Sequence, residues 1–533
     1  MIYIAIFVAA LWFAQWFLLR LPHDLHMLQQ NSYRNDRYRR WYKRNFRREA
    51  SLASWAFLLP AAAAWISRPA ALILFVLISV ISLAWGLTHK EKTIKPLVNT
   101  DRVKRLRWGA FALALLPAAL IGCLAWHAGS GTWTGRFMAM LAALAAGLFL
   151  RFSFVLAFCA NGLLAPVENK INRGFYREAQ EKLASMPQLR RVGVTGSYGK
   201  TSVKKILEAI ASEKYYTLAT PASYNTPMGI TRTVREQLRP THQVFIAEMG
   251  ARQKGDIQEL VELTAPQIGI LTAIGPQHME TFGSQQAIVD TKFELIRGLP
   301  AGGVAVLNFD DPLILANAAQ APCATVSYSL HNSDCDFWAE DIRYDQDGCI
   351  FTLCSREEKV TVRSRLLGEH NVSNILAAAA AASQLSVPLS MAARGVKHLT
   401  PVAHRLELKH RGKYLVLDDA YNANPAGAKA ALSVLAAMAG GQKIIITPGM
   451  VELGEMEEEL NRQFAAEMTK VADYIILVGN KRGEIMEPAL QAAGFPQERY
   501  YIAADLTDAH GKLAQIVQEG DVVLYENDLP DVY

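Results

Sequence analysis

Long apolar stretches separated by basic segments occupy the first 165 residues, and they constrain the fold more than any other feature of the chain. Each stretch approaches the roughly 20 apolar residues that an α-helix needs to cross a bilayer. The candidate spans are 1–20, about 51–66, about 70–88, 108–128 and about 136–160. The second is short, and Arg151 interrupts the fifth. The sequence therefore predicts a helical membrane region of about five spans over residues 1–165.

The segments between these spans are strongly basic. Residues 21–50 hold eight Lys/Arg and residues 90–107 hold seven. Residues 1–165 contain 19 Lys/Arg against 5 Asp/Glu, a net charge of +14, although the whole chain carries +6. Because basic loops remain in the cytoplasm, we expect a multi-pass protein of the cytoplasmic (inner) membrane whose catalytic domains, after about residue 165, lie in the cytoplasm. Residues 1–20 lack a basic leader and a small-residue cleavage site, which favours a retained anchor over a removed signal peptide.

Aromatic residues are interleaved with the basic residues of segment 34–48, a pattern that also occurs in nucleic-acid-binding surfaces. A membrane-interface anchor that attracts anionic lipid head groups explains these residues better, since the segment follows a predicted span. We therefore expect a lipid bilayer as a partner and no nucleic acid. The six cysteines show no paired CxxC spacing, which argues against zinc or disulfides and suits a cytoplasmic body.

A compact glycine-containing loop, Thr195–Ser202, follows the apolar run Val192–Val194 and leads into the helical stretch Val203–Ala211. A strand that ends in such a loop and opens a helix directs backbone N–H groups at phosphate, and the lysine and hydroxyls of the loop can serve phosphate and Mg²⁺. Only two residues separate its glycines, whereas the common P-loop has four. ATP binding is the favoured interpretation, and a glycine turn without a ligand is the alternative. The candidate nucleotide-binding residues are Gly196, Ser197, Gly199, Lys200, Thr201 and Ser202.

The chain after the membrane region is too long for one core, and its apolar runs alternate with helical stretches, which predicts two α/β domains, 166–400 and 401–533. Strands are expected at 191–195, 243–248, 267–274, 303–308, 414–418, 443–447, 474–478 and 521–525, with an antiparallel ribbon at 337–362. Glu248 ends one of these strands and His278 follows another. Because functional groups gather past the carboxyl ends of strands in open parallel sheets, we expect both near the glycine loop. A solvated turn or a structural histidine is the alternative for each residue taken alone.

Seven motifs, in their order and spacing, resemble the Mur ligase family, and most closely its ligases that add D-alanyl-D-alanine to a UDP-muramoyl tripeptide. The motifs are TGSYGKTS (195–202), AEMGA (247–251), QHMETFG (277–283), TKFELI (291–296), LLGEHNV (366–372), HRLE (404–407) and DDAYNANP (418–425). The resemblance covers roughly residues 190–480 and implies a P-loop-like central ATPase domain followed by a Rossmann-like C-terminal domain. It also implies a carboxylate–amine ligase, in which ATP phosphorylates a carboxylate, an amine attacks the acyl phosphate and phosphate leaves.

The resemblance implies roles for individual residues as well. The candidate catalytic residues are Lys200, which would hold the β- and γ-phosphates, His278 and Lys292. The implied metal ligands for two Mg²⁺ ions are Thr201, Glu248, His278 and Lys292, the last as a carbamylated lysine. Further nucleotide contacts are implied for Asn371, Arg405 and Asp419, and substrate contacts for Asn225, Asn422 and Asn424. Closure of the C-terminal domain would complete the site and exclude water.

The chain departs from the family at both ends. The membrane region replaces the family's N-terminal uridine-nucleotide-binding domain, so that a soluble UDP-muramoyl substrate loses its usual handle. The family has a basic Lys-Gly-Ser-Arg-like segment after the last strand, whereas this chain has the acidic segment Glu526–Asp531. If that edge meets the amine donor, charge complementarity favours a donor with a cationic amine and no anionic tail.

We therefore predict a membrane-anchored, ATP- and Mg²⁺-dependent amide ligase that acts on a cell-envelope (peptidoglycan-type) precursor, lipid-linked or close to the membrane. The expected partners are an amino-acid or dipeptide amine donor, an envelope-precursor carboxylate acceptor and other envelope-biosynthesis proteins. A poly-γ-glutamate-type synthetase, which adds free glutamate repeatedly, is one alternative. A nucleotide-binding membrane regulator without ligase activity is the other, although a scaffold would not need Lys200, Glu248, His278 and Lys292 together.

Overall fold

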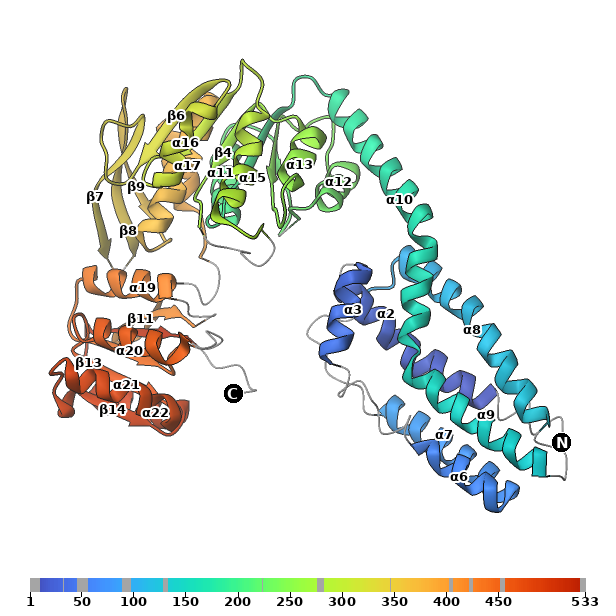
Figure 1. Ribbon diagram of the computed structural model, residues 1–533. Helices are drawn as coiled ribbons and strands as arrows, with labels where there is room; N and C mark the ends of the chain where they lie inside the picture. Colours follow the sequence, from blue (N-terminus) through green and yellow to red (C-terminus); the bar gives the residue numbers. More distant parts are fainter. Residues whose placement is uncertain are drawn as a thin grey trace. The chain divides into compact units, whose positions relative to one another are not determined.

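The computed structural model describes residues 10–31, 33–45, 56–88, 97–127, 133–222, 224–275, 282–345, 347–401, 406–420, 425–450 and 456–527 (Figure 1). The chain forms two compact units, Met1–Gly174 and Phe175–Tyr533. Helix α10 (Phe154–Ala184) contributes residues to both.

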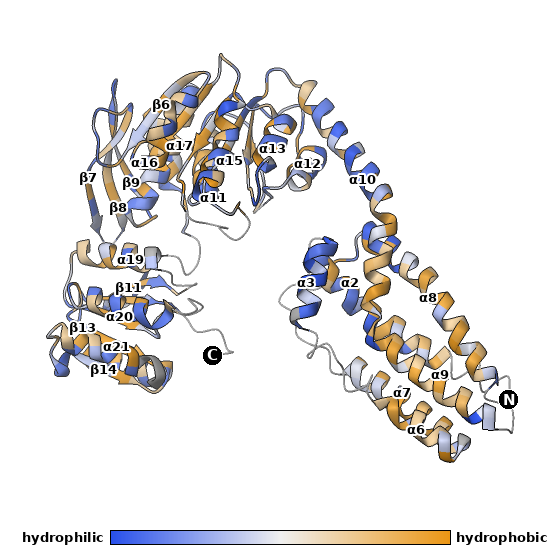
Figure 2. Cartoon of the chain, in the orientation of Figure 1, coloured by the Kyte–Doolittle hydropathy of each residue, from blue (hydrophilic) through white to orange (hydrophobic). Residues whose placement is uncertain are grey.

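The first unit is helical. Its helices are η1 (Trp16–Arg20), α2 (Leu21–Gln30), α3 (Asn35–Arg44), α6 (Leu58–Ile66), α7 (Arg68–Thr88), α8 (Asp101–His127), α9 (Trp133–Arg151) and the first part of α10. Within the described residues, three helical segments are long and apolar enough to cross a membrane: Pro69–Thr88, Asp101–His127 and Trp133–Arg151. Many large apolar side chains on α7 and α8 are exposed, for example Ile81 and Leu116, and most of the ribbon of these helices has the colour of hydrophobic residues in Figure 2. Such surfaces suit contact with lipid rather than water.

The structure differs from the predicted spans in two places. Helix α6 has nine residues, fewer than a membrane crossing requires. The predicted span 136–160 is divided, because α9 ends at Arg151 and α10 begins at Phe154. Buried polar groups gather at this break: Arg151 Nη1 donates to Tyr42 Oη (2.9 Å) and Ser153 Oγ donates to Asp24 Oδ2 (2.7 Å). Of the predicted first span, residues 1–9 lie outside the described residues, and residues 10–15 are helical and precede η1.

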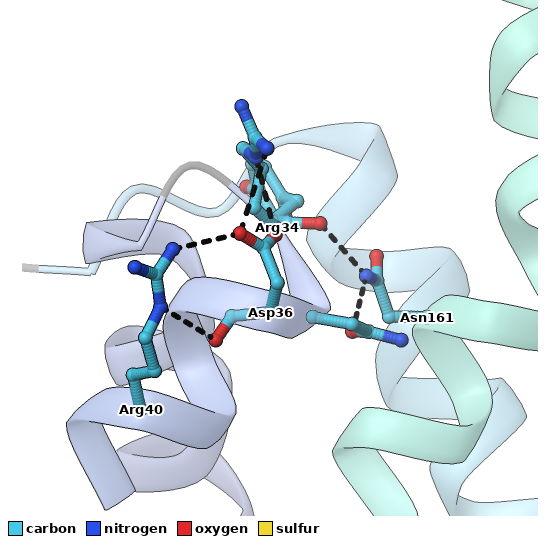
Figure 3. Close-up of polar contacts among 6 residues, drawn as sticks. Arg34, Asp36, Arg40 and Asn161 are labelled. Carbon is cyan, nitrogen blue, oxygen red and sulfur yellow. Dashed lines mark hydrogen bonds and ion pairs between the residues drawn. The ribbon is translucent and has the colours of Figure 1, made fainter. Parts of the chain in front are cut away.

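Helix α3 is attached to α10 by its polar start and by its aromatic face. Asn161 Nδ2 donates to the carbonyl of Tyr33 and to Asn35 Oδ1, each at 2.8 Å. On the other side of this turn Asp36 forms ion pairs with Arg34 (3.2 Å) and Arg40 (3.0 Å), as Figure 3 shows. The rings of Tyr38 and Tyr42 are buried, whereas the basic residues Arg39, Arg40 and Lys43 of the same helix are exposed.

The second unit contains two sheets, of which the first has nine strands in the order β2-β3-β1-β4-β5-β6-β7-β8-β9. The strands are β1 (Arg190–Thr195), β2 (Thr217–Ala219), β3 (Val244–Glu248), β4 (Ile268–Leu271), β5 (Val304–Asn308), β6 (Ala324–Ser329), β7 (Phe337–Asp345), β8 (Gly348–Ser355) and β9 (Lys359–Ser364). From β2 to β7 in this sheet order, β1 included, neighbouring strands pair in parallel. Strands β7, β8 and β9 form the predicted antiparallel ribbon. The alternating apolar side chains of the central strands enter two cores, one on each face.

Helices cover both faces of this sheet. One core contains α11 (Lys200–Ser212), α17 (Glu369–Gln384) and α18 (Leu389–Lys397). The other contains α12 (Pro227–Glu236), α13 (Asp256–Thr264), α15 (Gln285–Arg297), α16 (Pro312–Asn317) and the end of α10. The parallel strands therefore have their carboxyl ends at one edge, where the loops that follow them meet.

The second sheet has six strands in the order β10-β11-β15-β12-β13-β14. They are β10 (Glu407–Arg411), β11 (Tyr414–Asp419), β12 (Lys443–Thr447), β13 (Tyr474–Val478), β14 (Tyr500–Ala503) and β15 (Val522–Glu526). All pair in parallel except the edge strand β10. Helices α19 (Pro425–Ala437), α20 (Glu457–Met468) and α21 (Asn480–Ala492) pack on one face and α22 (Leu506–Ile516) on the other. The predicted fold class is confirmed: a helical region with three apolar helices of membrane-spanning length precedes two α/β domains.

Candidate functional site

The glycine loop has the strand–loop–helix geometry that the sequence predicts. Strand β1 ends at Thr195 and α11 begins at Lys200. Gly199 has φ +79°, and a Cβ atom there would lie 2.6 Å from Asn374 Oδ1. A Cβ atom on Gly196 would lie 2.0 Å from Thr272 Oγ1. Both glycines are therefore required by the close approach of neighbouring elements.

Two features make the loop suited to an anion. Helix α11 has no side-chain cap at its N-terminus, so its first N–H groups and its dipole are directed at the loop. Lys200 Nζ donates to the carbonyl oxygens of Gly196 (2.6 Å) and Ser197 (2.9 Å), which holds the ammonium group beside the same end of the helix. Burial lowers the pKa of Lys200, and the nearby carboxylate of Glu248 opposes this shift. Thr201 and Ser202 occupy the first turn of α11 and are half-buried.

The loop is fixed by the residues after β4. Ser197 Oγ donates to the carbonyl of Gly275 (3.1 Å), and the Ser197 N–H donates to the carbonyl of Ala273 (2.7 Å). Thr272 Oγ1 donates to the carbonyl of Tyr198 (2.5 Å). Ser197, which we predicted as a nucleotide contact, has its hydroxyl engaged within the protein. Strand β4 is shorter than the predicted 267–274 because residues 272–275 leave the sheet to hold the loop.

Glu248 lies next to the loop and is held by two other side chains. It ends β3 and pairs in register with Val194, one residue before Thr195. Asn225 Nδ2 donates to Glu248 Oε1 (3.0 Å), and Lys204 Nζ lies 3.0 Å from Oε2. Both Glu248 and Lys204 are 1% exposed. The ammonium of Lys204 also donates to the carbonyl of Ala222 (2.6 Å), so this lysine connects α11, β3 and the segment that carries Asn225.

Two of the predicted magnesium ligands, Glu248 and Thr201, lie at the glycine loop. Within the part of the chain that the structure describes, Glu248 Oε2 is buried, lies 3.0 Å from Lys204 Nζ and accepts no hydrogen bond, so a lone pair remains available. Thr201 lies on the adjacent first turn of α11, whereas His278 lies outside the described residues. Among the residues that the structure describes, no three His, Cys, Asp or Glu side chains form a metal cage. Because Mg²⁺ is commonly held by one or two carboxylates with waters and phosphate oxygens, Glu248 and Thr201 fit an ion that arrives with a nucleotide.

Lys292 is buried on α15 and is 4% exposed. Burial, followed by the charge of Lys200, lowers its pKa to about 7, while Asp256 and Glu294 oppose the shift. The carboxylate of Glu294 is engaged elsewhere, because it accepts hydrogen bonds from the N–H groups of Gly255 (2.8 Å) and Gln258 (2.9 Å). A substantial fraction of Lys292 is therefore a neutral, nucleophilic amine near neutral pH.

The predicted nucleotide contacts divide into two groups. Asn371 lies on the first turn of α17, where its side chain donates to the carbonyl of Leu367 (2.8 Å) and accepts from Asn374 Nδ2 (3.4 Å). It is thereby connected to the glycine loop through Asn374. Asp419 ends β11 in the second sheet, where its Oδ1 accepts the N–H of Leu406 (3.0 Å). Arg405, the remaining predicted nucleotide contact, lies outside the described residues, as do the predicted substrate contacts Asn422 and Asn424.

Three residues of this site were not predicted from the sequence: Lys204, Thr272 and Asn374. Lys204 had a detectable signal, since a lysine one turn after Lys200 stands among the apolar residues Val203, Ile206 and Leu207. Asn374 similarly precedes a run of buried alanines. Thr272 carries no comparable local signal, because its role depends on the approach of β4 to the loop.

The sequence matches two family models: Mur ligase middle domain over residues 194–382, and Mur ligase, glutamate ligase domain over residues 404–525. The UDP-N-acetylmuramoyl-tripeptide–D-alanyl-D-alanine ligase of Bacillus subtilis (strain 168) is 32% identical over 340 residues, which are 63% of this chain and 72% of the relative. The enzyme of the same name from Escherichia coli (strain K12) is 32% identical over 338 residues, with the same two coverages.

Two solved structures are similar over about two thirds of the chain. MurF from Acinetobacter baumannii has a TM-score of 0.55 at 25% identity, covering 67% of this chain and 77% of that one. The MurF ligase from Thermotoga maritima in complex with ADP has a TM-score of 0.56 at 25% identity, covering 67% and 80%.

Proposed function

The chain belongs to the Mur ligase family, and from this we propose that it is a membrane-anchored enzyme that joins an amine donor to the carboxylate of a peptidoglycan-type precursor. Membership makes it an ATP-dependent ligase that forms a peptide bond. The observation that carries the proposal is the position of the buried Glu248 beside Lys200 and the uncapped N-terminus of α11. A phosphate-binding helix end and a carboxylate with a free lone pair are what transfer of a phosphoryl group requires.

The reaction places negative charge in one small volume. The acceptor carboxylate attacks the γ-phosphorus of ATP, ADP leaves, and the amine then attacks the acyl phosphate so that inorganic phosphate departs. Lys200 and the N–H groups of α11 would bind the phosphate oxygens, and Glu248 with Thr201 would hold Mg²⁺. When bound, Mg²⁺ neutralises charge on the transferred phosphoryl group. Asn225, by donating to Glu248, would keep that carboxylate oriented.

Lys292 would supply a further anionic group. Its lowered pKa provides the neutral amine that can attack the carbon of CO₂. The new N–C bond leaves one proton to solvent and turns the lysine into a carbamate anion. An anion at this position would reduce the repulsion between Lys292 and Lys200.

The first unit supports attachment to the cytoplasmic membrane and access to a lipid-linked or membrane-proximal precursor. Three apolar helices of sufficient length are present, and their surfaces expose apolar side chains. Helix α3 presents exposed basic residues and is held to α10 through Asn35 and Asn161. Basic residues beside membrane helices attract the anionic cytoplasmic leaflet.

The test is phosphate release by the full chain in nanodiscs with ATP and Mg²⁺. UDP-muramoyl-peptides, lipid-linked muramoyl-peptides and free amino acids would be compared as acceptors, with and without D-alanyl-D-alanine, against Lys200→Ala. Amine-dependent release that disappears in the variant, with a matching product mass, would support the ligase and identify the acceptor. Repeated addition of free glutamate would instead support a poly-γ-glutamate-type synthetase. ATP binding without release for any pair would support a regulatory protein.

A further inference from the structure

The glycine loop is held in shape by segment 272–275, which leaves the sheet after β4. The Ser197 N–H donates to the carbonyl of Ala273 (2.7 Å), and Thr272 Oγ1 donates to the carbonyl of Tyr198 (2.5 Å). These bonds occupy groups of the loop, whereas no side chain of the described residues caps the first N–H groups of α11, which stay directed at an anion. Whatever fixes segment 272–275 therefore helps to fix the phosphate-binding end of α11.

Asp311, three residues after the end of β5, holds this segment with one of its two carboxylate oxygens. Its Oδ2 accepts the N–H of Ile274 (2.6 Å). Its Oδ1 accepts the N–H groups of Leu313 (2.9 Å) and Ile314 (3.2 Å) and thereby caps α16. Ile274 is 8% exposed, so that its N–H needs a partner within the protein. The carboxylate therefore ties segment 272–275 to the start of α16.

A second tether holds the other end of the segment. Asn308 Nδ2 donates to the carbonyl of Thr272 (2.9 Å) from the last residue of β5, the strand that pairs in parallel with β4. The segment in turn lies against the loop, since a Cβ atom on Gly275 would be 2.4 Å from Tyr198 Cε2. Both tethers start at the end of β5, so a shift of this strand end would be passed through the segment to the glycine loop.

Asp310, the preceding residue, is a matched comparison. Its carboxylate accepts hydrogen bonds from Ser329 Oγ and from the N–H of Leu330 (2.7 Å), both at the end of β6. Within the described residues, its side chain makes no hydrogen bond to segment 272–275. The two neighbouring aspartates thus have similar bonding roles, but the side chain of Asp311 alone of the two acts on the segment that holds the loop.

We propose that Asp311 is a positioning residue for the nucleotide: through the Ile274 N–H it holds segment 272–275, and through that segment it holds the phosphate-binding end of α11. The inference rests on the proposed ligase function, in which this helix end binds the phosphates of ATP. Asp311 acts through backbone groups and does not itself contact the nucleotide. Its effect falls on nucleotide affinity and phosphoryl transfer, which depend on a preorganised loop, and leaves binding of the amine donor unchanged.

The test compares the same substitution at the two aspartates, in the full chain in nanodiscs. Asp311→Ser keeps a hydroxyl that can cap α16, because serine is a good N-cap residue, but removes the oxygen that accepts the Ile274 N–H. Asp310→Ser is the control. Calorimetry measures the Kd of ADP with Mg²⁺, steady-state kinetics measure the KM values of ATP and of the amine donor, and hydrogen exchange follows peptides that contain Ile274 and the glycine loop. Thermal unfolding reports whether each variant folds.

We expect Asp311→Ser to raise the Kd of ADP and the KM of ATP about tenfold or more, to speed exchange in the glycine loop and to leave the KM of the amine donor within about twofold. Asp310→Ser should change the Kd of ADP by less than about twofold, even where it lowers the melting temperature as much. A purely structural role would instead lower the melting temperature of both variants and leave the ADP affinity of both alike.

If Asp311→Ser does not fold, Asp311→Asn takes its place, since it keeps the side-chain length but offers one oxygen to two sets of N–H donors. In either variant, loss of protection at Ile274 with ADP affinity within about twofold of the wild type would overturn the inference, as would equal weakening by Asp310→Ser. Binding of ADP that depends on Asp311, without phosphate release for any acceptor and donor, would support the inference and contradict the proposed ligase function.

Discussion

Replacing Lys204 with methionine tests the buried ion pair beside the phosphate loop. Methionine has a similar length and no charge, so the substitution removes the ammonium group and leaves the packing of α11 largely intact. Lys204 and Glu248 are each 1% exposed and their charged atoms lie 3.0 Å apart. The variant therefore leaves the Glu248 carboxylate buried with one hydrogen bond from Asn225. Loss of one partner of such a pair costs about 3–5 kcal/mol.

Hydrogen exchange in increasing denaturant measures this loss, because peptides from α11 and β3 report the local free energy of unfolding. The control is Lys204→Met combined with Glu248→Gln, which removes both charges and is expected to recover about half of the loss. Mg²⁺ with ADP should raise the melting temperature of Lys204→Met more than that of the wild type, because the ion supplies a cation to Glu248. A loss below about 1 kcal/mol, the range of exposed pairs, would refute the reasoning.

Lys292, Gly199 and Lys200 support three further predictions. In CO₂-free buffer, the wild type should gain about 2 kcal/mol of stability relative to Lys292→Met between pH 7 and 9, because the unfolded lysine keeps the proton that the native lysine, with a pKa of about 7, releases. Denaturant titration at each pH measures this gain, and a stability difference that does not change with pH would contradict the lowered pKa. Gly199→Ala should cost about 1–3 kcal/mol of stability, since φ is +79° and Asn374 Oδ1 would lie 2.6 Å from the new Cβ. Gly255→Ala, with φ +88° and open space around the new Cβ, should cost only about 1 kcal/mol. Melting temperatures compare the two variants, and equal losses would show that the contact with Asn374 contributes nothing. Lys200→Ala should lower the rate of phosphate release at least about 100-fold without lowering the melting temperature. An unchanged rate would show that this lysine does not bind the transferred phosphate.

The fold could be predicted well where its signals are local. The strands β1, β3, β5, β11, β12 and β13 coincide with runs of branched apolar residues, and each was placed within about two residues. The strands β2, β6, β10 and β14 were not predicted, because they are short or partly polar and are stabilised by their pairing partners; β2, β10 and β14 are also edge strands. The sequence identified Arg151 as an interruption of the span 136–160 but did not predict that a helix ends there, since this end depends on contacts of Arg151 and Ser153 with distant residues.

The sequence by itself determined the apolar helices, the alternation of strands and helices, and the glycine loop, because each follows from the chemistry of a few consecutive residues. Only the tertiary structure decided that Lys204 pairs with Glu248, that Asn374 requires a glycine at 199, and that Glu526 is buried beside Asp419. These pairs join residues that are far apart along the chain. Their energies arise from burial and charge at close range, which no local pattern encodes before the strands have paired.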